Sequence, residues 1–224
     1  MMGPGAHRII TLSDTMDTTL YLIRHAQSRP RESQHHSQWV LSERGRHQAE
    51  RLTPLLEPLG IRRLYSSPFT RCLETIGPFA AASGLDVHVV DDLRERLVVK
   101  TWVEDFEEVW SRSWTDFEYA LPGCEPSMPA QDRFARAVVT IVEECADGPI
   151  AISSHGNVIA LFLNWIDGAA GREEADALTN PDVLRISRRD DAFIWDREFR
   201  LPGLEEIASD YRETPVVRDG SVDS

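Results

Sequence analysis

Histidines and arginines stand at three places where a short apolar run of the sequence gives way to polar residues. Arg24 and His25 follow the run LYLI, His155 and Gly156 follow AISS, and Arg71 comes shortly after a Ser-Pro pair typical of a helix start. An imidazole can act as a nucleophile when a carbonyl holds its other nitrogen, and the backbone N–H groups of a helix start bind anions. These residues therefore suit a nucleophile beside an anion site, although each alone is also typical of a loop histidine or a surface arginine.

Alternating apolar runs and amphipathic segments predict strands separated by helices. The expected strands cover 20–23, 63–66, 87–90 and 150–153, and the expected helices cover 43–59, 128–146, 158–166 and a segment from 68 onward. Near the end, VLRIS and AFIWD flank turn residues and predict a hairpin at the sheet edge. This order predicts a βαβ architecture with a largely parallel sheet. Ligands of such sheets lie at the carboxyl ends of the strands, so the three histidine and arginine positions are expected at one edge.

Several residues are expected to set the helix boundaries. Ser42 should cap the first helix and Gly60 should end it. Ser67 should cap the second helix, with Pro68 at its first position. Pro78 is expected to bend or interrupt that second helix, because proline lacks an N–H donor.

The composition excludes several kinds of partner. The 224 residues include 37 acidic and 24 basic side chains, which gives a formal net charge of −13. Nucleic acids and anionic membranes both attract clustered positive charge, so neither is expected as a partner. A small anion remains compatible with this charge, because a local arginine cluster acts at short range.

The sequence also favours a reduced, cytoplasmic protein. Its three cysteines are far apart and show no metal-ligand spacing. Residues 1–17 lack the apolar run of a secretory signal, and the longest apolar stretch, Val158 to Ile166, is too short to span a membrane. We expect 1–17 to be a flexible N-terminal segment, 18–204 a single domain and 205–224 a polar C-terminal tail. The sequence carries no signature of an oligomeric state.

Four blocks of the sequence resemble the histidine phosphatase superfamily, in the phosphoglycerate mutase-like form of its smaller bacterial members. In chain order they are LYLIRHAQS, LSERGRHQAE, YSSPFTRCLET and AISSHGNVI, all within about residues 18–165. The resemblance implies an α/β fold, a doubly wound three-layer α/β/α sandwich with a mostly parallel sheet. It also implies a phosphohistidine intermediate, with no metal and no cofactor.

The resemblance assigns a role to each of the three strand-end positions. His25 would be the nucleophile that attacks phosphorus in line. Arg24, Arg71 and His155 would surround the phosphoryl oxygens, because charge spread over three oxygens needs positive donors already in place. His155 would have to be cationic, with a pKa raised by the bound anion, and the N–H of Gly156 would add a further donor.

The resemblance also implies a carboxylic acid after the third strand that protonates the leaving oxygen. The matching segment DDLRERLVVK makes Glu95 the candidate. As a carboxylate, Glu95 would then activate the water that hydrolyses phosphohistidine. The segment lacks the glycine and small residues that usually follow this acid, so a solvated glutamate flanked by arginines remains an alternative. Asp91, Asp92 and Glu104 are the other candidate acids.

Further positions can be compared with the family pattern. Ala26 follows the nucleophile where glycine is common, which requires only a permitted backbone angle. Arg31 stands where the family often has an asparagine that holds the phosphate. We expect Arg31 either to add a third positive contact or to lie on the surface. Glu125 and Ser127 match a pair that often precedes the long helix, and we interpret them as its start signal.

Aromatic residues are concentrated between the candidate acid and the long helix expected from 128. Within fewer than twenty residues lie Trp102, Phe106, Trp110, Trp114, Phe117 and Tyr119. Their near-helical spacing predicts a helix whose aromatic stripe packs on the domain, within a cap-like insertion over 96–130. In the alternative interpretation, Trp102, Phe106 and Trp110 line a pocket for a substrate with an aromatic or apolar part.

Resemblance to this family does not decide the reaction, because the same site serves mutases, broad phosphatases and selective metabolite phosphatases. Cofactor-dependent mutases of the family carry long basic segments around the pocket, and no such segment is found here. The leading hypothesis is a metal-independent phosphoric monoester hydrolase of the histidine acid phosphatase kind, acting on a small phosphorylated metabolite. The alternatives are a phosphoglycerate-type mutase and a catalytically inactive, phosphate-binding regulatory module.

Overall fold

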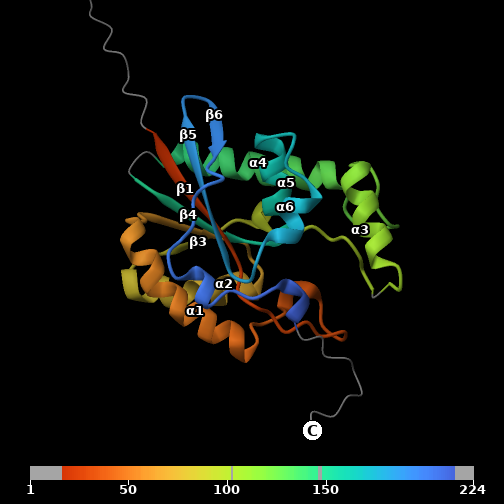
Figure 1. The fold of residues 1–224 in the computed structure, drawn as a ribbon, viewed down its shortest axis with the longest axis horizontal. Helices are drawn as coiled ribbons and strands as arrows, with labels where there is room; N and C mark the ends of the chain where they lie inside the picture. The colour runs from red at the N-terminus through yellow and green to blue at the C-terminus, as the bar shows by residue number, and fades with distance from the viewer. Residues whose placement is uncertain (1–16, 102, 146–147, 215–224) are drawn as a thin grey trace, which may run out of the picture.

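A computed structural model describes residues 17–101, 103–145 and 148–214 (Figure 1). The N-terminal segment expected to be flexible falls outside this range, except for Asp17. Six strands form one sheet in the order β3-β2-β4-β1-β5-β6. Their bounds are Thr18–Arg24 (β1), Arg63–Ser66 (β2), Val87–Val89 (β3), Ile150–Ser154 (β4), Asp182–Arg189 (β5) and Ala192–Trp195 (β6).

The sheet is mostly parallel, as predicted. Strands β3, β2, β4 and β1 run in the same direction, and β5 and β6 are added as an antiparallel hairpin at one edge. Arg24 at the end of β1 pairs in register with Ser154 at the end of β4. The carboxyl ends of these two central strands therefore lie side by side, and the segments that follow them begin at the same edge.

Helices cover both faces of the sheet. They are α1 (Glu43–Leu56), α2 (Thr70–Ser83), α3 (Phe106–Thr115), α4 (Ser127–Glu144), α5 (Gly156–Ile166) and α6 (Arg172–Ala177). Figure 1 shows α1 and α2 on one side, α4, α5 and α6 on the other, and α3 at one end of the molecule. This is the three-layer α/β/α sandwich that the sequence predicts. In the described part of the chain, no helix combines the length and the apolar character needed to cross a membrane.

The hydrophobic core has two parts, one on each face of the sheet, and the central strands contribute side chains to both. Along β1, Leu20 and Leu22 pack with α4 and α5, whereas Tyr21 and Ile23 pack with α1 and α2. Successive side chains of a strand point to opposite faces, so a strand covered on both sides needs a continuous apolar run. The run LYLI meets this requirement and fixes β1 in the centre of the sheet.

The boundaries of α1 follow the predicted signals. Ser42 accepts a hydrogen bond from the backbone N–H of Gly45 at 2.9 Å and caps the helix. After a short 3₁₀ turn, Glu57–Leu59, the chain leaves through Gly60 in the left-handed conformation at φ 64°. This conformation strains residues with a side chain, so a glycine ends the segment.

The predicted start of α2 is wrong by a few residues. The helix begins at Thr70, and its first flanking residue is Phe69 rather than Ser67. Ser67 accepts a hydrogen bond from the N–H of Phe69 at 3.2 Å, but its hydroxyl also contacts a histidine across the sheet edge. The Ser-Pro pair therefore belongs to the loop before the helix.

Of the two outcomes predicted at Gly77-Pro78, a bend or an interruption of α2, the interruption is wrong. The helix continues through Pro78 to Ser83. Proline removes one hydrogen bond of the helix, but Ile76 and Phe79 on either side of it are buried in the core. Their packing holds the helix together across the missing bond.

The domain extends beyond the boundary expected at 204. Ile207 is buried in the core, and Ser209 forms a β-bridge with Asn180. A 3₁₀ turn at Tyr211–Glu213 follows. The segment from 205 to 213 is therefore part of the packed structure rather than a polar tail, and the remainder of that tail, from 215 onward, is outside the described residues.

Candidate active site

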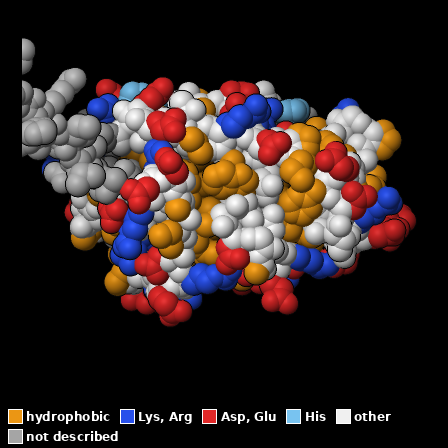
Figure 2. Space-filling model, turned by 90° about the horizontal axis from the view of Figure 1, so that it is seen from above, with side chains coloured by type: hydrophobic (Ala, Val, Ile, Leu, Met, Phe, Trp, Pro, Cys, Tyr) orange, Lys and Arg blue, Asp and Glu red, His pale blue; other side chains and the backbone are white. Residues whose placement is uncertain are grey.

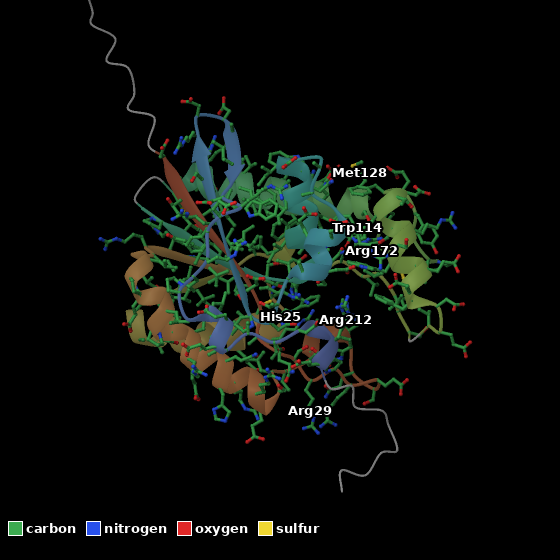
Figure 3. The ribbon with its side chains drawn as sticks, viewed as in Figure 1. His25, Arg29, Trp114, Met128, Arg172 and Arg212 are labelled. Atoms are coloured by element: carbon green, nitrogen blue, oxygen red, sulfur yellow. The ribbon has the colours of Figure 1, made fainter. Side chains whose placement is uncertain are left out.

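Three loop segments meet at the carboxyl edge of the sheet, as the sequence predicts. The N–H of His25 donates to the carbonyl of Ser154 at 3.0 Å, and the N–H of Ser67 donates to the carbonyl of Ser153 at 2.9 Å. Figure 3 shows His25 near the centre of the molecule, between the two helical layers. The structure thus brings together the residues that follow β1, β2 and β4.

The buried His25 ring has a different partner at each nitrogen: a backbone carbonyl at Nδ1 and an arginine side chain at Nε2. Its Nδ1 lies 2.7 Å from the carbonyl oxygen of Ala26, and Nε of Arg71 donates to its Nε2 at 3.0 Å. Because the guanidinium is always a donor, we assign the proton to Nδ1 and the lone pair to Nε2. Burial, together with Arg71 and Arg24, holds the pKa of His25 well below its usual 6.5. The ring is therefore neutral, in the tautomer that a nucleophile requires.

Arg71 is fixed on several sides. Its Nη1 donates to the carbonyl of His36 at 2.6 Å, and its guanidinium carbon lies 5.0 Å from the Phe69 ring and 5.8 Å from the Trp39 ring. These contacts aim the guanidinium at His25. The planar, delocalised charge of arginine suits such stacking, which a lysine would not reproduce.

His36 is a neighbour of the site that the sequence did not reveal. Its half-buried ring lies 5.0 Å from the Phe69 ring. Burial, His35 and Arg71 lower the pKa of His36 to about 4, so it is neutral near pH 7. Two adjacent histidines in a polar loop carry no pattern that would distinguish the one that faces the site.

His155 is fully buried and lies directly against the candidate nucleophile. Its ring centre is 5.3 Å from that of His25, and its Nε2 is 2.7 Å from the hydroxyl oxygen of Ser67. Burial, followed by Arg71 and His25, holds the pKa of His155 well below 6.5 in this structure. The cationic form expected for His155 applies to the complex with an anion and stays a prediction.

Arg24 crosses over the start of α5. Its Nη1 donates to the carbonyl of Leu178 at 2.6 Å. A Cβ atom added to Gly156 would lie 2.9 Å from both the Cζ and the Nε of Arg24. Such an approach is too close, so a side chain at this position would push the Arg24 guanidinium from its place over the helix start. The pairing explains why glycine follows His155.

Glu95 lies at the same helix start. Its carboxylate accepts hydrogen bonds from the N–H groups of Asn157 and Val158, both at 3.2 Å, and from its neighbour Arg96 at 2.9 Å. Burial lowers the pKa of Arg71, and among the groups that oppose this shift is Glu95. The candidate acid is therefore held at the start of α5, next to His155, and is not a freely solvated glutamate.

The other candidate acids lie at the surface. Asp91 and Asp92 are exposed and bind Arg94 at 2.7 and 3.1 Å. Glu104 is exposed in the segment before α3. Of the four carboxylates considered, Glu95 is the one bound to the start of α5, and its role as a proton donor stays a prediction.

Buried polar residues that sequence reasoning missed hold the backbone of the loop after β1. The side chains of Thr75 and Gln48 each accept a hydrogen bond at 2.9 Å, from the N–H groups of Ala26 and Gln27 respectively. Asn180 donates to the carbonyl of His25 at 2.8 Å. Thr75 and Gln48 stand within the conspicuous blocks RCLET and RHQAE, whereas nothing in the sequence marks Asn180.

Neither Arg31 nor the aromatic residues of α3 make a side-chain contact that assigns them a role in binding substrate. Arg31 is partly exposed, and its carbonyl accepts the indole N–H of Trp39 at 3.1 Å. Phe106 is 44% exposed, and Trp110 donates to Asp176 on α6 at 2.9 Å. Trp102 lies outside the described residues. The roles suggested for these side chains in binding substrate stay predictions.

The aromatic stripe packs largely as predicted. The rings of Phe106, Trp110, Trp114 and Phe117 follow one another with centre distances of 6.3, 5.7 and 6.0 Å. The last three pack against the core that contains α4 and α5.

The described residues contain no group of three or more His, Cys, Asp and Glu side chains close enough to bind a metal ion. The metal-independent reaction that the resemblance implies stays a prediction.

Comparison with known proteins agrees with this geometry. The model of the histidine phosphatase superfamily (branch 1) matches residues 20–197, and the chain belongs to this family. It is similar to the probable phosphoglycerate mutase GpmB of Salmonella paratyphi B, with 26% identity over 187 residues that cover 78% of this chain and 87% of the relative.

Solved structures with the same fold include both mutases and phosphatases. The phosphoglycerate mutase from Bacillus anthracis matches with a TM-score of 0.72 and 19% identity, covering 87% of this chain and 98% of that one. The mycobacterial glucosyl-3-phosphoglycerate phosphatase solved with VO3 matches with a TM-score of 0.66 and 21% identity, covering 80% and 96%. These matches confirm the phosphoglycerate mutase-like fold.

Proposed function

We propose that this protein is a phosphomonoesterase that hydrolyses a small phosphorylated metabolite through a phosphohistidine formed at His25. The observation that carries the proposal is the state of the His25 ring. Its Nδ1 is bound to the Ala26 carbonyl, and its Nε2 faces Arg71, where the anionic phosphoryl group would lie. A neutral imidazole held in this way can attack an electrophile once a bound phosphoryl group takes over the Arg71 donor from Nε2.

The reaction would take place in two steps. In the first, Nε2 of His25 attacks phosphorus, the P–O bond to the leaving group breaks, and Glu95 gives that oxygen its proton. In the second, the Glu95 carboxylate takes a proton from water, whose oxygen attacks phosphorus and releases phosphate from His25. Arg24 and Arg71 would hold the phosphoryl oxygens throughout, with His155 and the N–H of Gly156 as further donors.

The charge of the segment beside the pocket favours hydrolysis. Between Glu95 and Arg133 the sequence has three basic side chains, Arg96, Lys100 and Arg112, against eight acidic ones. A mutase that retains a doubly phosphorylated compound needs a strongly basic pocket mouth, because two phosphates carry several negative charges. This segment does not provide one, so we favour water as the final phosphoryl acceptor.

The first test measures phosphate release from p-nitrophenyl phosphate and from a panel of sugar, nucleotide, glycerate, aryl and isoprenoid phosphates. We expect His25→Ala to lose at least about 10³-fold in activity, because the covalent step is removed. His47→Ala is the matched control, since that side chain is 69% exposed on α1. If His25→Ala hydrolysed p-nitrophenyl phosphate at the parental rate, the nucleophile assignment would be wrong.

Two further experiments test for the phosphohistidine intermediate and for a metal requirement. Rapid quenching with labelled substrate should trap an acid-labile, base-stable phosphoryl group on the parent and none on His25→Ala. Activity should persist in EDTA. Loss of activity in EDTA with recovery on adding a divalent metal would contradict the metal-free mechanism.

The second candidate function is a phosphoglycerate-type mutase, which the similarity to the probable phosphoglycerate mutase GpmB favours. Incubation with a phosphorylated glycerate separates the two functions by their products. A phosphatase accumulates free phosphate, whereas a mutase accumulates the isomer. A chain that forms neither product from any ester but still binds phosphate would instead be a catalytically inactive binding module.

A further inference from the structure

An arginine outside the phosphoryl pocket holds the loop that carries the candidate acid. Arg133 lies on α4 and is only 4% exposed. Its Nε and Nη2 donate to the two carboxylate oxygens of Glu125 at 2.7 and 2.8 Å. Its Nη1 donates to the carbonyls of Asp92 and Arg94, both at 2.8 Å. One guanidinium thus joins Glu125, near the end of the insertion, to two of the three residues that precede Glu95.

Further hydrogen bonds hold the chain on both sides of Glu95. The carbonyl of Leu93, between the two that Arg133 binds, accepts the hydroxyl of Ser154 at 2.8 Å, and Leu93 is fully buried. On the other side of Glu95, Nε of Arg96 donates to the carbonyl of Glu125 at 2.8 Å. The N–H of Glu125 in turn donates to the carbonyl of Leu97 at 2.9 Å. Consecutive carbonyls before the acid, and the chain after it, are therefore all held in place.

The choice of residues fits positioning better than stability. A buried ion pair contributes little net stability, because removing two charges from water offsets most of their attraction. Arg133 uses one edge of its planar fork for Glu125 and the other for two carbonyls. A lysine would keep the charge but could not span these partners. Glu125 lies just before α4 and Ser127 is the first residue of this helix, but the Glu125 carboxylate binds Arg133 and does not cap the helix.

We propose that Arg133 and Glu125 are positioning residues that fix the distance and direction of Glu95 relative to His25. The proposal rests on the function proposed above, in which Glu95 protonates the leaving oxygen. It separates two tasks within the pocket: Arg24 and Arg71 hold the phosphoryl group, and the pair on α4 places the proton donor. Loss of the pair should therefore impair leaving-group protonation more than phosphate binding.

The test compares Arg133→Lys with the parent on phosphate esters whose leaving groups differ in acidity. An alkyl phosphate needs a proton on its leaving oxygen, whereas 2,4-dinitrophenyl phosphate releases a stable anion without one. We expect kcat/KM to fall about 10²-fold for the alkyl ester, as a misplaced catalytic group can cost, and to change little for the dinitrophenyl ester. Arg136→Lys, an exposed position one turn along α4, is the matched control and should match the parent on both.

A double-substitution cycle identifies the group through which Arg133 acts. Glu95→Gln alone should show the same dependence on leaving-group acidity, and adding Arg133→Lys to it should cause little further loss. Additive losses, an equal loss on all esters, or no loss at all would each overturn the proposal.

A second variant covers the case in which Arg133→Lys does not fold. Glu125→Gln keeps the size of the side chain but weakens the paired contact, and it is judged by the same two esters and the same cycle. A parent that releases no phosphate from any ester would refute the proposed function itself. An active parent with a leaving-group-independent loss would refute only the positioning role.

Discussion

At His25 the two ring nitrogens meet opposite kinds of partner, because Nδ1 faces a carbonyl and Nε2 faces a guanidinium. A protonated ring could satisfy the first partner but would meet repulsion from the second. The neutral ring satisfies both, and burial favours the same form. The arrangement therefore stores the candidate nucleophile in its reactive state instead of relying on a proton transfer at the moment of reaction.

The neutral state of His25 and His155 predicts how the free energy of unfolding depends on pH. Both groups have pKa values well below 6.5 in the folded protein, so near pH 6 the unfolded chain binds protons that the folded one does not. Their contribution to stability is complete above about pH 6.5 and is lost as the pH falls below it, by up to about 2.7 kcal/mol per pH unit for two protons.

Urea unfolding between about pH 5 and pH 8 checks this slope. His155→Asn should reduce the slope by one proton, about 1.4 kcal/mol per pH unit, relative to the parent. The exposed His47→Asn should leave it unchanged. Equal slopes in all three proteins would show that His155 is protonated in the folded state.

Gly156 is a second residue whose identity the geometry requires. In Gly156→Ala the new Cβ would lie 2.9 Å from the Arg24 guanidinium, so that side chain must move. We expect kcat/KM to fall by about 10²-fold, the cost of removing one preorganised donor to the transition state. Gly168→Ala is the matched control, because a Cβ there meets nothing within 4 Å. Parental activity of Gly156→Ala would mean that Arg24 does not bind substrate from its present position.

At the scale of elements, the strands and their order along the chain were predictable because each depends on local patterns. The apolar run LYLI, the cap at Ser42 and the glycine at 60 are all read within a few residues. The contact of Ser67 with His155 joins positions 88 apart, and that of Asn180 with His25 joins positions 155 apart. No local pattern encodes such pairs, so Ser67 was mistaken for a helix cap and Asn180 was missed.

The difference between local patterns and long-range contacts also explains which residues of the candidate site could be predicted from the sequence. His25, Arg71 and His155 lie in blocks that resemble a known family, and Glu95 lies in a segment that matches it less well; the fold places all four at one edge of the sheet. The supporting contacts of Arg133 were not found, because its partners are backbone carbonyls, which any residue type supplies. The residue type of a donor does not indicate which backbone carbonyl it will bind in the folded protein.

Helix α2 gives a prediction at this scale, because it supports the loop after β1 through Thr75. The hydroxyl of Thr75 accepts the N–H of Ala26 at 2.9 Å in a buried setting. Thr75→Val keeps the shape but leaves that N–H unsatisfied, which should lower the free energy of unfolding by about 1–3 kcal/mol. Thr53→Val on α1 is the comparison, since that partly buried hydroxyl only bonds back to Ala49 within its own helix. An equal effect of the two substitutions in urea unfolding would contradict a supporting role for Thr75.

The whole molecule combines a strongly negative net charge with a group of basic side chains gathered at one edge of the sheet. The net charge is −13, while Arg71 and His155 are buried at the sheet edge and Arg24 lies partly buried beside them. Figure 2 shows acidic side chains spread over one face, with basic ones between them. At long range such a surface repels anions in proportion to their charge, whereas the pocket attracts a phosphoryl group only at short range. The protein is therefore expected to prefer compact monoesters over polyphosphates.

The salt dependence of activity distinguishes long-range repulsion by the acidic surface from short-range attraction by the buried basic side chains. Raising the ionic strength from about 20 to about 200 mM shortens the screening length from roughly 20 Å to below 10 Å, so it weakens repulsion by the surface more than attraction within the buried pocket. We expect kcat/KM for tripolyphosphate to rise several-fold relative to that for p-nitrophenyl phosphate over this range. The ratio of the two values, measured in one salt series, cancels effects on the enzyme itself. Faster turnover of the polyphosphate at low salt would mean that the pocket's own field reaches beyond the acidic surface.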